Sequence, residues 1–334
     1  MAEQDAVAWN ETEVAGLVAK TAALKASMGR VIIGQDNVVE LLIICLLAGG
    51  HALVEGVPGL GKTLLVKSLA QATDMQFRRV QFTPDLMPSD IVGTEILEED
   101  AVTHKRVFRF QQGPVFTQVL LADEINRAPP KTQSALLEAM QERAVTFAGQ
   151  TYTLPQPFFV LATQNPIEQS GTYPLPEAQL DRFLLRIDVG YPSEDEEVAM
   201  VASTTRSSLQ EATPAMDVAT LLRLQLLVRD IEIGEHLLRY ATRLVRATRP
   251  GDSTVSSIRR HVGWGAGPRA GQALVLASKA RALMHGRLAV TRDDVQAMLL
   301  PVLAHRVLRN FEAEADGVAI ADILAALRSE IRVD

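Results

Sequence analysis

The sequence predicts an α/β fold, with a parallel five-stranded sheet sandwiched by helices and a C-terminal all-helical domain. In the first two thirds of the 334 residues, short apolar runs alternate with helical patterns, which is typical of a parallel sheet covered on both faces. After about residue 192, apolar residues recur every three or four positions, which is the period of a helix. We therefore expect an α/β core at 1–192 and a helical lid domain at 193–334.

The expected strands are short and rich in apolar residues. They are 51–56, 77–82, 119–124, 158–165 and 184–190. Helical patterns lie between them at 61–73 and 131–142, and N-terminal helices are expected at about 10–48. Two segments, about 91–112 and about 143–157, break this alternation and have the pattern of hairpin inserts.

The composition is that of an ordinary soluble globular protein, with 47% apolar and 22% charged residues. The single cysteine, Cys45, excludes a disulfide framework and fits a reducing compartment. The longest apolar stretch contains Glu40 and spans about 12 residues, which is too short to cross a bilayer. The first residues lack the pattern of a signal peptide. We expect a cytoplasmic protein with no membrane span.

The net charge of −7 is unevenly distributed along the chain. Residues 239–309 contain thirteen basic and three acidic side chains, a local charge of +10, which leaves −17 on the remainder. One interpretation is a surface for nucleic acid. We favour a basic face that meets an acidic face of another domain or subunit, because aromatic residues are not regularly interleaved with these arginines as stacking on bases would require.

The segment GVPGLGKT at 56–63 directly follows an expected strand and opens a helix. Its spacing matches G-x-x-x-x-G-K-[ST], in which glycines let backbone N–H groups wrap a phosphate at a helix N-terminus. Lys62 is placed to reach the β- and γ-phosphates, and the Thr63 hydroxyl to bind Mg²⁺. The predicted nucleotide contacts are Gly56, Val57, Pro58, Gly59, Leu60, Gly61, Lys62, Thr63 and Leu64.

Two further expected strands end in polar side chains. Asp123 and Glu124 follow four apolar positions, and a carboxylate there can hold Mg²⁺ beside the loop. Glu124 is placed to orient the attacking water or accept its proton. Asn165 ends another apolar run, where an amide can hold the water or the γ-phosphate, although it could equally be a turn residue before Pro166.

Taken together, these motifs resemble the MoxR family of AAA+ ATPases over about residues 25–330. The resemblance is carried by VIIGQ, EGVPGLGKT, QFTPDLMPSDIVG, GPVF, LLADEINRAPPKTQSALLEAMQE, VLATQNP, LPEAQLDRF, GPRA and HRVLRNFEAE. It implies a P-loop NTPase core with the helix-2 and pre-sensor inserts of this clade, binding ATP or ADP with Mg²⁺.

The resemblance also implies roles for single residues. Asn165 matches sensor 1, Arg182 the arginine finger and Arg269 sensor 2, whose action within one chain or on a neighbour is left open. Ile32, Ile33 and Gly34 match the segment beside the adenine. Arg182 follows Asp181 in sequence, so on the sequence alone it could equally be half of a surface ion pair.

The function implied by the resemblance is a chaperone-like remodeller. It would assemble as a homo-oligomeric ring, expected to be a hexamer. ATP turnover by the ring would mature or activate client complexes, together with adaptors that often carry a von Willebrand factor A domain. Alternatives from the same clade are a nucleic-acid motor, for which the basic segment is the only support, and a chelatase-like motor subunit. A nucleotide switch without turnover is disfavoured by the intact Asp123–Glu124 pair.

Overall fold

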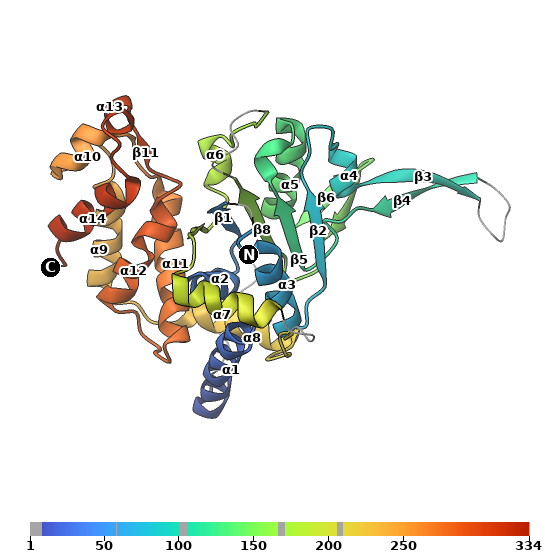
Figure 1. Ribbon diagram of the computed structural model, residues 1–334, viewed down its shortest axis with the longest axis horizontal. Helices are drawn as coiled ribbons and strands as arrows, with labels where there is room; N and C mark the ends of the chain where they lie inside the picture. Colours follow the sequence, from blue (N-terminus) through green and yellow to red (C-terminus); the bar gives the residue numbers. More distant parts are fainter. Residues whose placement is uncertain (1–8, 58, 100–105, 166–170, 206–209, 334) are drawn as a thin grey trace.

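The computed structural model describes residues 9–57, 59–99, 106–165, 171–205 and 210–333. Its centre is a parallel sheet in the order β2-β5-β8-β1-β9, which confirms the predicted fold class (Figure 1). The strands are β1 Ala52–Gly56, β2 Phe77–Gln81, β5 Val119–Asp123, β8 Phe159–Gln164 and β9 Leu185–Val189. Because all five are parallel, their carboxyl ends meet at one edge, where ligands of such sheets bind.

Helices pack on both faces of the sheet, and the alternation of side chains along each strand divides the core in two. On one face Val54 and Leu161 pack with the N-terminal helices, and on the other Leu53 and Val160 pack with α5. The helices are α1 Glu11–Gly29, α2 Asp36–Leu47, α3 Lys62–Ala72, α4 Pro88–Val92, α5 Pro130–Glu142 and α6 Glu177–Leu180, with a 3-10 turn at Ile125–Arg127. The long apolar stretch of the sequence is α2, which is buried along most of its length.

The two segments predicted as hairpins are antiparallel pairs outside the main sheet. Strands β3 Gly93–Glu99 and β4 Arg106–Gln112 form one pair, which extends away from the body of the molecule (Figure 1). Strands β6 Ala144–Phe147 and β7 Gln150–Thr153 form the other.

The C-terminal third is helical except for one small sheet. Its helices are α7 Glu194–Thr204, α8 Val218–Asp230, α9 Glu235–Arg246, α10 Ser256–His261, α11 Pro268–Met284, α12 Arg292–Leu303, α13 Phe311–Ala315 and α14 Ile320–Glu330. The expectation of an almost wholly helical region missed β10 Val262–Trp264 and β11 Leu308–Arg309, whose antiparallel pairing joins two helix ends. None of the helices in the described ranges is long and apolar enough to span a bilayer.

The helical region packs directly on the N-terminal helices. Side chains of α1, α2, α8 and α11 share one hydrophobic cluster, so the core is continuous across the division near residue 192, which stays a prediction. Figure 1 shows α9 to α14 gathered at one end of the molecule, while α7 crosses below the sheet.

Candidate functional site

The loop between β1 and α3 has the geometry that phosphate binding needs. Gly59 and Gly61 have φ angles of 87° and 74°, in the left-handed region that glycine adopts without strain. A Cβ at Gly56 would lie 2.6 Å from the Val189 carbonyl oxygen, so this glycine permits the close pairing of β1 with β9. The 11-residue α3 begins at Lys62 and directs its first N–H groups at the loop. Pro58 lies outside the described residues.

The two carboxylates at the end of β5 are each held by a cationic and a polar neighbour. The Asp123 carboxylate accepts hydrogen bonds from Thr163 Oγ1 at 2.6 Å and from Arg79 Nη2 at 2.7 Å. The Glu124 carboxylate accepts from Gln81 Nε2 at 2.8 Å and from Arg127 Nη1 at 2.9 Å. These bonds fix both carboxylates next to the loop.

Glu124 has a left-handed backbone, with φ 55°, at the point where the chain leaves β5. Its N–H donates to Thr163 Oγ1 at 2.8 Å, and the same hydroxyl donates to Asp123. Thr163 on β8 therefore positions both carboxylates, which the parallel pairing of β5 with β8 makes possible.

A cavity of about 290 Å³ lies where these elements meet. It is lined by Gly59, Gly61, Lys62, Thr63, Arg79, Gln81, Asp123, Glu124, Thr163 and Asn165. The structure thus brings together the loop, both carboxylates and Asn165 as predicted from the sequence. Sequence reasoning missed Arg79, Gln81 and Thr163. The signal for the first two was the polar end of the strand FRRVQF, but only the sheet order places that end beside β5.

The charged side chains of Lys62 and Glu55 are partly buried and so partly desolvated. Burial lowers the pKa of Lys62, while the nearby Asp123, Glu124 and Glu55 carboxylates act to raise it. The Lys62 ammonium donates a hydrogen bond to the Gly56 carbonyl oxygen. Burial also raises the pKa of Glu55, against the effect of Arg186, whose guanidinium lies 2.9 Å from it. Since burial penalises an ammonium, a bound anion would favour the charged form of Lys62.

The segment Ile32–Gly34, predicted to lie beside the adenine, is next to the phosphate loop. The Gln35 side-chain amide donates to the Leu60 carbonyl oxygen at 3.2 Å, which connects the two segments. Gly34 has φ 74°, and a Cβ there would lie 2.6 Å from the Glu196 Cβ of α7. On α3, Leu64 is 42% exposed and does not line the cavity.

The two predicted arginines do not line this cavity. Arg182 follows α6, and its Nη1 donates to the Leu137 carbonyl oxygen on α5 at 2.5 Å. It lines a different cavity of about 390 Å³ together with Glu138 and Gln179. Arg269 lies in the first turn of α11, with its side chain 63% exposed.

Asp181 pairs with two arginines that are distant in sequence, and among the described residues it does not pair with Arg182. Arg306 Nε donates to Asp181 Oδ1 at 2.7 Å, and the Arg306 side chain is only 4% exposed. Arg269 Nη1 lies 3.9 Å from Asp181 Oδ2. The surface ion pair between Asp181 and Arg182 that the sequence allowed is therefore not formed.

Comparisons with known proteins agree with this arrangement. Residues 51–185 match the ATPase family associated with various cellular activities (AAA), and residues 256–327 match the AAA lid domain. The chain is 44% identical to chaperone MoxR1 of Mycobacterium tuberculosis, over 91% of this chain and 80% of that protein. It is 34% identical to protein MoxR of Paracoccus denitrificans, over 85% and 87% of the two chains.

The chain belongs to the MoxR family of AAA+ ATPases. A solved structure from Cytophaga hutchinsonii, described as a candidate ATPase, superimposes with a TM-score of 0.90 at 39% identity and covers 97% of this chain and 98% of that one. This MoxR-family protein is thus a chaperone-like AAA+ ATPase, with a P-loop core and an AAA lid.

Proposed function

We propose that this MoxR-family ATPase hydrolyses ATP in a Mg²⁺-dependent reaction within a ring, most simply a hexamer, in which each site is completed by a neighbouring chain. One observation carries the proposal. Lys62, Asp123, Glu124 and Asn165 converge on a single cavity, whereas Arg182 lines another one. The family resemblance makes Arg182 an arginine finger, and a finger that lies outside its own chain's site would act on a second copy.

Within one chain, each cavity residue has a task that its chemistry allows. Lys62 and the loop N–H groups bind the β- and γ-phosphates. Glu124, held by Gln81 and Arg127, orients water and accepts its proton. The Asn165 amide fixes the water or the γ-phosphate. The Thr63 hydroxyl and the Asp123 carboxylate are oxygen ligands of the kind Mg²⁺ prefers, and the ion would neutralise phosphate charge.

Arg182 is suited to act on a neighbour's ATP. A guanidinium is always protonated and forks onto two oxygens, and an arginine finger contributes about 10³–10⁵ in rate. In this chain the Arg182 side chain donates only to a backbone carbonyl, so no carboxylate neutralises it within the described residues. Arg269 lies near Asp181, the residue next to Arg182, and we place it at the same interface.

The turnover drives remodelling of other proteins in this proposal. The MoxR1 relative bears the name chaperone, which supports a protein client. We propose a cytoplasmic cycle in which the ring matures or activates partner complexes, together with adaptors that carry a von Willebrand factor A domain.

Mixing two inactive variants tests the shared site. Glu124→Gln chains keep Arg182 but cannot activate water, and Arg182→Ala chains keep Glu124 but lack the finger. When the two are mixed, an Arg182→Ala site next to a Glu124→Gln chain receives an intact arginine. Phosphate release by the mixture should therefore exceed that of either variant alone, at the same total protein concentration.

The control is a mixture of Glu124→Gln with Glu124→Gln, Arg182→Ala double-variant chains, which contains no intact Glu124 and should stay inactive. The wild-type activity per chain should also rise with protein concentration. An Arg182→Ala chain with wild-type kcat, or full activity of a dilute monomer, would contradict the shared site.

A further inference from the structure

A groove on the lid has an apolar floor. It lies between α9 and α11, reaches the end of α8 and has a volume of about 850 Å³. The apolar side chains along it are Leu238, Val245, Val275 and Leu276. Leu238 is 39% exposed. We call this surface the α9–α11 groove.

The rim of the α9–α11 groove is entirely basic. Its charged lining residues are Arg229, Arg246, Arg249 and Lys279, and no acidic residue lines it in the described part of the chain. Asp252 lies 3.6 Å from Arg246 and 3.9 Å from Arg249, and the Asp230 carboxylate attracts the Lys279 ammonium. Two carboxylates thus act on four basic groups, and the rim keeps a positive charge.

Gly271 keeps the wall of the groove low. It lies within the 17-residue α11, where glycine costs about 0.5–1 kcal/mol relative to alanine. A Cβ built there would meet no atom within 4 Å, so packing inside the chain does not explain the glycine. A segment docked in the groove would occupy the open space above Gly271.

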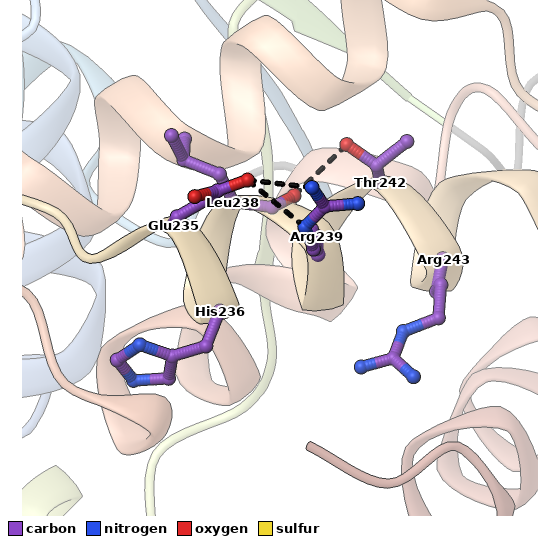
Figure 2. Close-up of a pocket in the computed structure, with 6 residues that line it drawn as sticks. All are labelled: Glu235, His236, Leu238, Arg239, Thr242 and Arg243. Atoms are coloured by element: carbon purple, nitrogen blue, oxygen red, sulfur yellow. Dashed lines mark hydrogen bonds and ion pairs between the residues drawn. The ribbon is translucent and has the colours of Figure 1, made fainter. Parts of the chain in front are cut away.

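The neighbouring surface of α9 differs from the groove in its charge. Figure 2 shows Glu235 paired with Arg239 on this surface, with Nη2 and Oε1 2.6 Å apart. Here an acid of the same helix already neutralises the arginine. The α9–α11 groove, with four basic lining residues, is therefore more positive than this surface.

Helix α7 carries the complementary chemistry on an uncovered face. None of its 11 residues is buried, although a helix this short is marginal without packing. Val198 and Val201 are 64% and 53% exposed. At helical spacing they lie on the same face as Glu194 and Glu197, which are also exposed. This face is a short apolar stripe with an acidic border.

We propose that α7 of one chain docks in the α9–α11 groove of the next chain in the ring. Val198 and Val201 would cover the apolar floor, and Glu194 and Glu197 would face the basic rim. The two surfaces are different parts of one chain, so the contact is heterologous and can close into a ring. The inference rests on the proposed ring, and it gives a use to the basic segment 239–309.

Helix α7 would connect the docked lid of the neighbouring chain to the nucleotide site. Glu196 lies on the opposite side of α7 from Val198 and packs over Gly34, beside the phosphate loop. Its carboxylate also accepts from the Ser193 backbone N–H and hydroxyl, each at 2.8 Å, which fixes the start of α7. A neighbour's lid on α7 would thereby contact the helix that covers Gly34, in the segment predicted to lie beside the adenine.

Cross-linking between two chains, each with one introduced cysteine, tests the contact directly. One chain carries Val201→Cys and the other Gln272→Cys, an exposed residue that lines the groove. The native Cys45 is fully buried and burial raises the pKa of its thiol, so it should stay silent. Mild oxidation with ATP should give a disulfide-linked dimer from the mixture, which either variant alone should not form efficiently.

Charge reversal gives a second, independent readout by analytical ultracentrifugation. Glu194→Lys with Glu197→Lys should raise the concentration needed for assembly about tenfold or more, because like charges then face each other. Adding Arg229→Glu and Arg246→Glu to the same chain should restore assembly. The matched control, Glu314→Lys with Glu330→Lys, makes the same change of charge on other exposed helices and should assemble normally.

The outcomes separate this inference from the ring itself. A ring that forms without the cross-link and is indifferent to the α7 reversal would overturn the docking and leave the shared ATP site intact. A wild-type chain that stays monomeric with ATP would overturn both. Cross-linking together with charge-swap rescue would establish the docking.

Discussion

The phosphate cavity and the surface around Arg182 and Arg269 differ in how completely their charged side chains are paired within one chain. In the cavity, residues from three strand ends converge and each carboxylate has a partner: Asp123 pairs with Arg79, and Glu124 with Arg127. Among the described residues around α6 and the start of α11, Arg182 donates only to a backbone carbonyl, and Arg269 is 3.9 Å from its nearest acid.

This difference indicates what each region does before a second chain arrives. A cavity with its charges balanced is already positioned for ATP and needs little rearrangement of its own residues. Exposed arginines with weak partners lose little when they turn to an anion on another chain, since a loose surface ion pair contributes only about 0–1 kcal/mol. The phosphate cavity should therefore carry out hydrolysis in each chain, and the surface around Arg182 and Arg269 should make hydrolysis depend on assembly.

Apart from loss of the Arg182 finger, the largest expected effect is in the cavity. Glu124→Gln keeps the shape of the side chain but cannot accept a proton, so kcat should fall by about 10²–10⁴. ATP binding should persist, because Lys62 and the loop are unchanged. Phosphate release and nucleotide titration measure the two effects. A variant that loses both equally would show that Glu124 holds the fold of the site, and this would contradict its role in activating water.

The same variant offers a way to reach the client. A chain that binds ATP without hydrolysing it should hold its partner complexes, and the wild-type chain without ATP is the matched control. A von Willebrand factor A domain protein recovered only by the ATP-bound variant is the expected result. Recovery of nucleic acid alone would favour the motor interpretation of the basic segment.

A smaller effect separates the two arginines that share Asp181. Arg306 is buried and donates to Asp181 and to the Phe183 carbonyl oxygen at 2.6 Å, so it fixes the lid to the end of α6. Arg306→Met should lower the free energy of unfolding by about 3 kcal/mol, because a buried pair loses one partner. Arg269→Ala should change it by about 0.5 kcal/mol or less, yet lower ATPase activity.

Denaturant midpoints and ATPase rates of the two variants make the comparison. Equal losses of stability would show that Arg269 is a structural residue like Arg306. If Arg269→Ala leaves both stability and ATPase rate unchanged, the proposed role of Arg269 at the interface is wrong.

The sequence predicted the parts of the site that are continuous in the chain. The loop from Gly56 to Thr63 carries its own geometry, and Asp123 and Glu124 follow an unmistakable buried strand. Arg79 could not be predicted, because its importance arises from the order β2-β5-β8-β1-β9, which pairs β2 with β5 only in the folded sheet. The pairing of Asp181 with Arg306 spans 125 residues and depends on how the lid packs, which periodicity does not reveal.

The smallest expected effect tests Arg79, one of the three cavity residues that the sequence did not predict. Arg79 donates to Asp123 through Nε at 3.1 Å and Nη2 at 2.7 Å, so it competes with a metal ion for that carboxylate. The Arg79 side chain is 47% exposed, which limits the contribution of this ion pair to about 0–1 kcal/mol, equivalent to at most about a fivefold change in Mg²⁺ binding. Arg79→Ala should therefore lower the Mg²⁺ concentration that half-saturates the ATPase by about two- to fivefold.

Arg78→Ala is the matched control for this change. Arg78 precedes Arg79 on β2 and points to the other face of the strand. Within the described residues its one side-chain hydrogen bond is a long one, at 3.5 Å, to the Gly113 carbonyl oxygen. It should leave the Mg²⁺ requirement unchanged. A higher Mg²⁺ requirement in Arg79→Ala than in Arg78→Ala would contradict this prediction. It would mean that Arg79 orders the Asp123 carboxylate for the metal ion and so assists Mg²⁺ binding instead of competing with it.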